Sequence, residues 1–393
     1  MPINFELDEE HILLRDTVRD FVQKFIKPIA QEIDEKEEFP FESVRKMGEM
    51  GFLGIKVSPK YGGAGMNTLA YIILIEELSK VCPSHGIIAS VNNSLYAYGI
   101  ERFGTEEQKE KFLKPLVSPE SAGATLKSGK INIGAYALTE SHTGSDAASL
   151  KSRAIKDGSR YIINGRKVWI TNGPVAKYII FFAQTDPEKG HKGITAFIVD
   201  MEREGAKVGS REKKLGIRAA WSGEIILEDY VADESEVLGK EGEGFKIAME
   251  ILNDGRIGVG AQALGIAEGA YEEAKEFSKT RYAFGKPIYE HEAVGFTLAD
   301  MWARIEASRL LLYQAAYLKD FGKEYHWASS MAKLFASETA MWVTTKAIQI
   351  MGSMGYSRET NSQRLFRDAK VTEIYEGTSE IQRLILLRKL ISS

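Results

Sequence analysis

Apolar residues in the first part of the chain recur at helical spacing. Between residues 8 and 34 they form an amphipathic stripe of Ile12, Leu13, Val18, Phe21, Val22, Phe25 and Ile26. Residues 59–65, which include proline and three glycines, interrupt the pattern because these residue types break helices and strands. An asparagine cap predicts a helix over residues 67–78, and residues 105–108 match a capping box before another helix. We therefore expect an N-terminal helical domain over residues 1–127.

A different pattern begins near residue 128, where β-branched and aromatic residues come in short runs between turn residues. Asn164-Gly165 lies between two such runs, and this dipeptide is a strong hairpin signal. Further runs occupy residues 178–185, 193–201 and 224–231. Their spacing favours an antiparallel sheet or small barrel over βαβ units. We expect a middle β domain over residues 128–238.

The remainder of the chain returns to helical spacing. One apolar stripe consists of Val294, Leu298, Met301 and Ile305, and another of Met331, Leu334 and Phe335. Small residues dominate between residues 257 and 270, which allows helices to approach closely. Long helices with short connections are typical of a bundle. The whole chain therefore predicts an α+β fold: an N-terminal helical domain, a middle antiparallel sheet or barrel, and a C-terminal four-helix bundle over residues 239–393.

One carboxylate, Glu376, stands between the aromatic Tyr375 and the flexible Gly377. Ser379 and Gln382 fit a capping box, so we expect Glu376 on a short loop just before a helix N-terminus. A carboxylate beside an aromatic ring and shielded from water has a raised pKa, which suits a general base near neutral pH. The alternative is an ordinary surface glutamate on a loop.

Three other stretches are unusual for their chemistry. Residues 136–146 place hydroxyls and glycine in a loop after a strand, where backbone N–H groups can meet an anion or a heteroaromatic ring; a plain connector is the alternative. Within residues 167–173, alternation places Trp169 and Thr171 on one face of a strand, and a core-facing pair is the favoured interpretation. Residues 349–356 end a helix with two glycines, which fits close approach to a ligand or a simple C-cap.

Composition narrows the class of protein. A net charge of −4 on 393 residues gives no indication of binding to nucleic acid or to an anionic membrane. Cys82 is the one cysteine, so no intrachain disulfide can form and a reducing compartment is expected. The N-terminus lacks the pattern of a signal peptide, and no apolar run reaches membrane-spanning length. We therefore expect a cytoplasmic protein.

Several common chemistries lack their sequence motifs. No GxGxxG opens a helix after a strand, and there is neither a P-loop nor a GxSxG elbow. The six histidines are scattered without the spacing of metal ligands. We therefore expect no metal site and no Rossmann-type nucleotide domain.

A series of motifs nevertheless resembles the acyl-CoA dehydrogenases. They are PKYGGAG, RFGTEEQ, YALTE followed by TGSD, NGRKVWITN, KLGIR, RYAFGKP, LADM, QIMGSMGY and IYEGTSEIQR. Their order and spacing match over residues 59–383, which is far more specific than any single motif. Within the family, SVNNSLY and GEGFKIAM are most similar to the short-chain (butyryl) members.

The resemblance implies the three-domain fold, usually as a homotetramer, and FAD bound without a Rossmann unit. The residues implied to contact the flavin or its phosphates are Tyr136, Leu138, Thr139, Gly144, Ser145, Trp169, Ile170 and Thr171. Those implied to meet the FAD of a neighbouring subunit are Arg281, Phe284, Gln349, Gly352 and Ser353. Glu292 is implied to lie near a flavin contact, and Thr378 and Glu380 near the flavin's phosphate or adenosine end. Those implied to contact acyl-CoA are Ser145, Asn253, Asp254, Arg256 and Gly377.

The family carries its catalytic base either in the EGT loop or just before the arginine of an LDxxR motif. The second position is Gly255 here, so the resemblance assigns the base to Glu376. Glu376 would remove the α-proton of a short- to medium-chain acyl-CoA while the β-hydrogen leaves as hydride to flavin N5, giving a trans-2-enoyl-CoA. The electrons would pass to an electron-transfer flavoprotein, as in fatty acid β-oxidation.

Three residues depart from the family pattern. Asn253 replaces an aspartate, although Asp254 follows it. Glu292 replaces a glutamine near a flavin contact, and Ser353 replaces a glycine. Two other functions stay open: an acyl-CoA oxidase that uses oxygen, and a flavin-binding or assembly protein on the same scaffold without dehydrogenase activity. Arg281 could also simply end a helix and pair with a nearby carboxylate.

Overall fold

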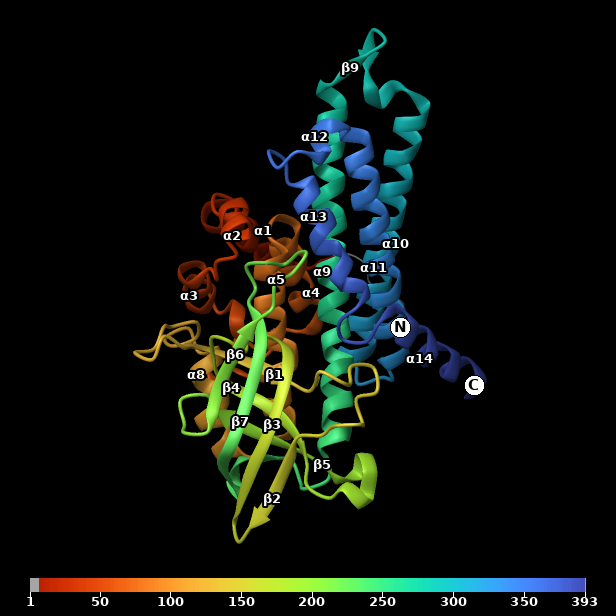
Figure 1. The fold of residues 1–393 in the computed structure, drawn as a ribbon. Helices are drawn as coiled ribbons and strands as arrows, with labels where there is room; N and C mark the ends of the chain where they lie inside the picture. Colours follow the sequence, from red (N-terminus) through yellow and green to blue (C-terminus); the bar gives the residue numbers. More distant parts are fainter. Residues whose placement is uncertain (1–6, 393) are drawn as a thin grey trace.

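The computed structural model describes residues 7–392; residues 1–6 and 393, at the ends of the first and last predicted domains, lie outside the described part. In Figure 1 the N-terminal helices and the β-sheet lie along one side of a set of long C-terminal helices. The predicted α+β fold class is therefore confirmed. No helix within residues 7–392 is long and apolar enough to cross a membrane.

The N-terminal region consists of helices joined by short turns. The helices are α1 (Glu9–Phe21), α2 (Ala30–Lys36), α3 (Phe41–Glu49), α4 (Thr68–Val81), α5 (Pro83–Ser90), α6 (Tyr98–Phe103), α7 (Glu106–Gln108) and α8 (Lys114–Val117). π-Helical turns are η1 (Val22–Ile26), η4 (Val91–Ala97) and η5 (Lys109–Leu113), and 3₁₀ turns are η2 (Phe52–Gly54) and η3 (Pro59–Tyr61). The predicted capping box at residues 105–108 forms. Ile12 and Leu13, predicted within the buried stripe, are instead 40% and 69% exposed, because α1 packs on α4 through another face.

The middle region forms one mixed sheet. Its strands are β1 (Ile131–Ala137), β2 (Arg153–Asp157), β3 (Arg160–Thr171), β4 (Ala176–Gln184), β5 (Ile194–Asp200), β6 (Ala206–Arg211), β7 (Ser222–Asp233) and β8 (Val237–Leu238), with 3₁₀ turns η6 (Pro187–Gly193) and η7 (Glu234–Glu236). The order is β6-β7-β3-β2-β4-β5-β8, with β1 beside β4. Most pairs are antiparallel, as predicted, but β1 and β2 run parallel to β4. Every residue of β1 is buried, which is typical of a parallel strand.

The hairpin predicted at Asn164-Gly165 is wrong. Strand β3 continues through this dipeptide, and the turn that joins it to β2 lies at Gly158-Ser159, where Gly158 has φ of 60°. Gly165 lies beside a register shift against β7, and a Cβ there would come within 2.2 Å of Ser152 Oγ. The glycine is therefore required for close packing within the sheet and not for a turn.

Long helices dominate the C-terminal region. They are α9 (Gly244–Thr280), α10 (Glu292–Asp320) and α11 (His326–Met351), followed by α12 (Ser353–Tyr356), α13 (Ser362–Ala369) and α14 (Ser379–Ser392). Between them lie β9 (Tyr282–Ala283), β10 (Lys286–Pro287) and the 3₁₀ turns η8 (Ile288–Glu290) and η9 (Lys370–Glu373). Helices α9, α10 and α11 run side by side, and α13 packs against α9 and α11 (Figure 1).

The two apolar stripes predicted in this region differ in their outcome. Leu298, Met301 and Ile305 on α10 are buried, as expected. On α11 the buried face instead contains Ala332, Lys333, Ala336 and Ala340, whereas Met331, Leu334 and Phe335 are half-buried. Small residues fill this face because α9 and α11 approach closely.

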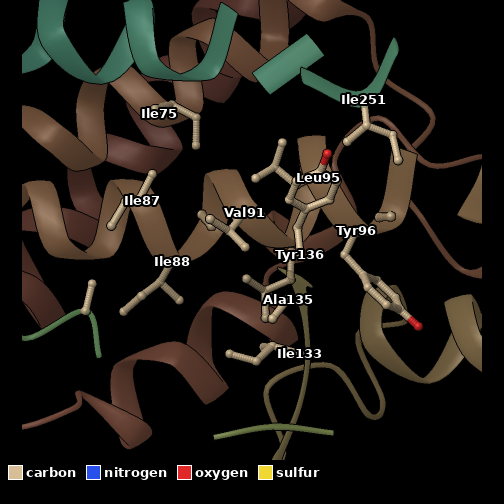
Figure 2. Close-up of a cluster of buried hydrophobic side chains, with 14 of the residues drawn as sticks. Ile75, Ile87, Ile88, Val91, Leu95, Tyr96, Ile133, Ala135, Tyr136 and Ile251 are labelled. Carbon is tan, nitrogen blue, oxygen red and sulfur yellow. The ribbon is translucent and has the colours of Figure 1, made fainter. Parts of the chain in front are cut away.

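The three regions share one hydrophobic core. Figure 2 shows side chains from α4, α5, η4, β1 and α9 converging in this core, among them Ile75, Ile88, Leu95, Tyr136 and Ile251. Because Leu95 and Tyr136 come from the helical and β regions and Ile251 from α9, the core fixes all three regions around one point. The candidate site lies beside it.

Candidate active site

Glu376 lies on a short loop between η9 and α14, as predicted. Its φ is 54°, and Gly377 follows with φ of 95°. Left-handed backbone is uncommon for a residue other than glycine and, where it occurs, is often found at functional sites. The predicted capping box is wrong, because α14 begins at Ser379 itself and the Gln382 amide turns inward to donate to the Gly377 carbonyl at 2.8 Å.

One oxygen of the Glu376 carboxylate is shielded from solvent, and the residue as a whole is half-buried. Its Oε2 atom is inaccessible and has no hydrogen-bond partner within residues 7–392. Burial raises the pKa of Glu376 to about 8, and the positive charges of Lys333 and Arg256 partly oppose this effect. A carboxyl group with its pKa in this range can take up or release a proton near neutral pH.

Helix α9 approaches the carboxylate at Gly255. A Cβ on this residue would lie 2.0 Å from Glu376 Oε2 and 2.7 Å from Leu95 Cδ2. One turn further, a Cβ on Gly258 would lie 2.1 Å from the Tyr71 hydroxyl. Both glycines therefore give space to side chains of the site.

Three tyrosines line the same region. Tyr375 donates a hydrogen bond to Gln262, Tyr136 donates to the Ala248 carbonyl at 3.3 Å, and Tyr71 is hydrogen-bonded to a serine hydroxyl at 2.8 Å. Burial, and then the nearby charge of Glu376, raises the pKa of Tyr136 and Tyr375 far above its ordinary value. All three are thus neutral at working pH and give the carboxylate an aromatic surrounding.

The predicted acyl-CoA contacts on α9 differ in their environment. Asp254 is fully buried and forms ion pairs with Lys56 and Lys319, which hold its pKa below the ordinary value against the effect of burial. Asn253 accepts a hydrogen bond from Arg256 Nη1, and Arg256 Nε has no hydrogen-bond partner within residues 7–392. Arg256 therefore keeps donor capacity for a ligand, whereas Asp254 is already satisfied by its lysines.

The loop that follows β1, which is predicted to contact the flavin, is anchored by a buried ion pair between Lys167 and Glu140. Lys167 Nζ lies 2.7 Å from Glu140 and also donates to the Leu138 carbonyl at 3.1 Å. Glu140, partly buried, has its pKa lowered to about 2 because the nearby Lys167 outweighs burial. The Val168 N–H donates to the Thr139 carbonyl at 3.0 Å, which joins the two predicted flavin segments.

The ends of these segments face outward. Gly144 and Ser145 are exposed, and a Cβ on Gly144 would meet no atom within 4 Å. The core-facing interpretation of Trp169 is wrong, because its side chain is 57% exposed while that of Ile170 is buried. Trp169 has φ of 62° and lies at a register shift in β3, which interrupts the alternation of side chains along the strand. Thr171 is half-buried and hydrogen-bonded to a serine hydroxyl at 3.1 Å.

A second group of predicted cofactor residues lies at the far end of the long helices. Arg281 follows α9 directly, and Phe284, in the β9–β10 turn near the top of Figure 1, is 96% exposed. Glu292 is the first residue of α10. The side chains of Arg281, Phe284 and Glu292 are all exposed to solvent. The nearby Glu276 pairs with Lys279 at 2.7 Å. Arg281 itself forms no ion pair with any carboxylate within residues 7–392. The alternative of a simple intrachain pair is not seen.

Gln349, Gly352 and Ser353, at the end of α11, are also exposed. Gly352 has φ of 60° and ψ of −133°, a conformation that favours glycine. Thr378 and Glu380 instead adjoin the Glu376 loop and line a cavity of about 190 Å³ together with Glu338 and Lys370. Within one chain Tyr136 and Thr378 therefore lie near Glu376, whereas the group around Arg281 lies at the far end of the long helices.

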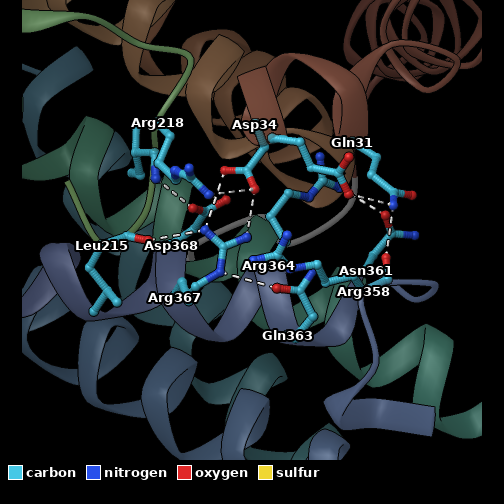
Figure 3. A network of polar contacts seen from close by, with 12 residues as sticks. Gln31, Asp34, Leu215, Arg218, Arg358, Asn361, Gln363, Arg364, Arg367 and Asp368 are labelled. Atoms are coloured by element: carbon cyan, nitrogen blue, oxygen red, sulfur yellow. Dashed lines mark hydrogen bonds and ion pairs between the residues drawn. The ribbon is translucent and has the colours of Figure 1, made fainter. Parts of the chain in front are cut away.

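A polar network fixes helix α13, which precedes the Glu376 loop (Figure 3). Arg367 on α13 forms an ion pair with Asp34 on α2 at 2.6 Å and donates to the Leu215 carbonyl at 3.0 Å. Asp368 accepts a hydrogen bond from the Ile217 N–H, and burial raises the pKa of Asp368 to about 6. The network ties α13 to the helical and β regions at once.

One inward-facing residue, Lys333, was not identified from the sequence, and Gln382 was assigned a different role there. Lys333 donates from Nζ to the Gly377 carbonyl at 2.8 Å, and Gln382 donates to the same oxygen. The available signal was a lysine among small residues on the inner face of a helix, between Ala332 and Ala336. Within residues 7–392 no group of three or more histidine, cysteine or acidic side chains could hold a metal ion.

Comparison with known proteins agrees with this arrangement. Residues 8–120, 135–230 and 242–391 match the N-terminal, middle and C-terminal domains of acyl-CoA dehydrogenase. The chain is 48% identical to a short-chain specific acyl-CoA dehydrogenase of Clostridium acetobutylicum, over 99% of this chain and 100% of that protein.

Two solved structures show the same fold. Butyryl-CoA dehydrogenase from Megasphaera elsdenii has a TM-score of 0.94 at 42% identity, covering 99% of this chain and 100% of that one. A chain solved in a study of the electron transferring flavoprotein of Acidaminococcus fermentans has a TM-score of 0.95 at 45% identity, with 99% and 100% covered. The family resemblance noted in the sequence is confirmed, and the chain belongs to the acyl-CoA dehydrogenase family.

Proposed function

We propose that this chain oxidises short- to medium-chain acyl-CoA thioesters to trans-2-enoyl-CoA, with Glu376 as the base that removes the α-proton. The observation that carries the proposal is the Glu376 carboxylate, whose Oε2 is buried without a hydrogen-bond partner within residues 7–392 and whose pKa is raised to about 8. Members of this family depend on FAD, and FAD is the cofactor of this enzyme. When bound, FAD supplies the acceptor for the β-hydride at its N5 atom.

The residues of the flavin segments fit this cofactor. Trp169 exposes more than half of its surface from a left-handed backbone position, and its neighbour Val168 donates a backbone hydrogen bond to Thr139. A large exposed aromatic ring suits a heteroaromatic ligand. We assign Tyr136, Leu138, Thr139, Gly144, Ser145, Trp169, Ile170 and Thr171 to the flavin, and Thr378 and Glu380 to its phosphate or adenosine end.

Glu376 acts through its position and its proton affinity. An α-proton of a thioester is weakly acidic, and hydrogen bonds to the carbonyl oxygen stabilise the charge that develops on it. The backbone N–H of Glu376 is assigned to this oxygen, and Arg256, Asn253, Ser145 and Gly377 to the rest of acyl-CoA. Asp254 supports this set through its pairs with two lysines instead of by direct contact.

The bulky side chains around Glu376 support a preference for short acyl chains. Leu95, Tyr71 and Tyr375 all lie close to the carboxylate or to the α9 glycines that face it. Each is buried or half-buried, and we propose that together they limit the space for a longer chain. The similarity to short-chain relatives supports the same preference.

We further propose a homotetramer built as a dimer of dimers, with FAD bound between two chains. Arg281, Phe284, Glu292 and the segment 349–353 lie away from the base in their own chain, which supports contact with a neighbour's FAD. Electron-transfer flavoprotein is the proposed electron acceptor, fatty acid β-oxidation the proposed pathway, and the cytoplasm the proposed location. The domain boundaries near residues 128 and 239 remain our proposal.

One experiment tests the central claim. The purified protein is mixed with acyl-CoA substrates of increasing length, and flavin bleaching and dye reduction are followed with and without oxygen. We expect bleaching with short chains and electron transfer to the dye without a requirement for oxygen. Glu376→Gln keeps the shape of the side chain and removes the base, so it should retain FAD and acyl-CoA but lose bleaching. Bleaching by the variant at the wild-type rate would assign the base elsewhere.

A further inference from the structure

The Gly377 carbonyl beside the candidate base accepts two side-chain hydrogen bonds from different helices. Lys333 donates from α11 and Gln382 from α14, each at 2.8 Å. The loop between them carries two consecutive residues, Glu376 and Gly377, with positive φ. A strained conformation of this kind persists only where the surroundings hold it, and these two donors come from helices that are themselves packed in the bundle.

Lys333 is an unusual choice of donor. The residue is 0% exposed and lies on the inner face of α11, where its neighbours are small. A neutral side chain such as the Gln382 amide makes the same hydrogen bond without burying a charge, and an unpaired buried charge is costly. A buried ammonium group at Lys333 is therefore expected to have a negatively charged group nearby that stabilises it.

The charged groups around Lys333 identify that partner. Burial lowers the pKa of Lys333 to about 8, and Glu376 is the carboxylate that opposes this most strongly. Glu373 and Glu380 act in the same sense from more solvated positions, and Arg256 acts against the ammonium. Seen from Glu376, the facing charges are Lys333 and Arg256, with Asp254 behind them.

We propose that Lys333 is a positioning residue for the base: its ammonium group holds the Gly377 carbonyl, and its buried charge favours the ionised form of Glu376. The inference rests on the function proposed above. Lys333 and Gln382 both anchor the loop through the Gly377 carbonyl. Only Lys333 also brings a positive charge to Glu376.

The sign of the effect follows from the charges. Removing the positive charge raises the pKa of Glu376, so a larger fraction of the base is protonated at neutral pH and flavin reduction is slower there. Raising the pH above the new pKa restores the ionised base and the rate. An opposite charge within a few ångströms shifts a carboxyl pKa by about one to three units, so we expect at least a tenfold slower reduction below the midpoint.

The test compares Lys333→Gln, Lys333→Arg and Gln382→Leu with the wild type by stopped-flow flavin reduction with butyryl-CoA between pH 6 and 10. Lys333→Gln keeps a donor and loses the charge, so its midpoint should move up by about one unit or more. Lys333→Arg keeps the charge and should keep a midpoint close to that of the wild type. Gln382→Leu loosens the loop without changing charge, so it should slow reduction equally at every pH.

A second readout does not depend on turnover. The infrared band of the protonated Glu376 carboxyl, identified by its loss in Glu376→Gln, should titrate at higher pH in Lys333→Gln than in the wild type. FAD absorbance and thermal unfolding check that each variant is folded. Should Lys333→Gln fail this check, Lys333→Arg decides alone, because a raised midpoint in a variant that keeps the charge contradicts the inference.

The possible failures are distinct. A wild type that does not bleach with any acyl-CoA overturns the proposed function itself. A wild type that bleaches, together with a Lys333→Gln variant of unchanged midpoint and band position, overturns only the role of Lys333. Identical pH profiles for Lys333→Gln and Gln382→Leu would reduce Lys333 to a structural anchor and equally overturn it.

Discussion

Replacing Gly255 by alanine adds one methyl group directly against the proposed base. The new Cβ would lie 2.0 Å from Glu376 Oε2 and 2.7 Å from Leu95 Cδ2. Carbon and oxygen atoms that are not bonded stay more than 3 Å apart, so the carboxylate, the leucine or helix α9 has to move by roughly 1 Å. The carboxylate is the least restrained of these, because its Oε2 has no hydrogen-bond partner within residues 7–392.

Stability and activity should respond differently to this change. Alanine gains about 1 kcal/mol over glycine in a helix interior, whereas overpacking costs about 1–3 kcal/mol. The two effects partly cancel, so we expect the free energy of unfolding to fall by no more than about 2 kcal/mol. A displacement of about 1 Å in a catalytic group can lower the rate about 100-fold, so flavin reduction should fall by one to two orders of magnitude.

The matched control is Gly260→Ala in the same helix. Its Cβ would also lie 2.7 Å from a leucine methyl, Leu312 Cδ2, but it meets no atom of Glu376 and reaches the Lys333 backbone only at 3.6 Å, an ordinary van der Waals distance. Both variants are compared by FAD absorbance, thermal unfolding and stopped-flow reduction with butyryl-CoA. We expect Gly260→Ala to change stability alone. Reduction by Gly255→Ala within twofold of the wild type, in a folded FAD-bound protein, would refute the placement of the carboxylate.

Two further predictions concern distant parts of the chain. Arg281→Ala should lower FAD occupancy and oligomer mass together, measured by absorbance and light scattering, because a guanidinium shared with a neighbour's FAD couples the two equilibria; a fully yellow variant of unchanged mass would contradict this. Asp368 has its pKa raised to about 6 by burial, so its ionisation destabilises the fold between about pH 4 and 6. Asp368→Asn should therefore gain thermal stability relative to the wild type as pH rises through that window, and a constant difference would disprove it.

Local sequence patterns predicted the architecture and the base loop because these depend on repeated signals. Many apolar positions define each helix or strand, so single exceptions such as the exposed Leu13 do not change the fold class. The loop around Glu376 was predicted from its neighbours Tyr375 and Gly377, whereas the assignment of Glu376 as the base comes from the family resemblance and stays a prediction. The domain boundaries, by contrast, stay predictions.

Features that depend on a single residue were predicted less well. Asn164-Gly165 has the composition of a hairpin turn, yet packing against Ser152 and pairing with β7 keep it within a strand. The left-handed backbone at Trp169 broke the alternation that sequence reasoning assumed. In each case tertiary contacts outweighed a local preference, and no pattern within a short window contains those contacts.

The two base positions known from the family resemblance are close in space in this structure. A Cβ on residue 255 would point at Glu376 Oε2 from a distance of 2.0 Å, although 121 residues separate the two positions (376 − 255). A side chain from α9 and one from the loop before α14 would therefore compete for the same volume in the proposed site. The pair of Gly255 and Glu376 satisfies this steric constraint, because only a residue without a side chain at position 255 leaves room for the Glu376 carboxylate.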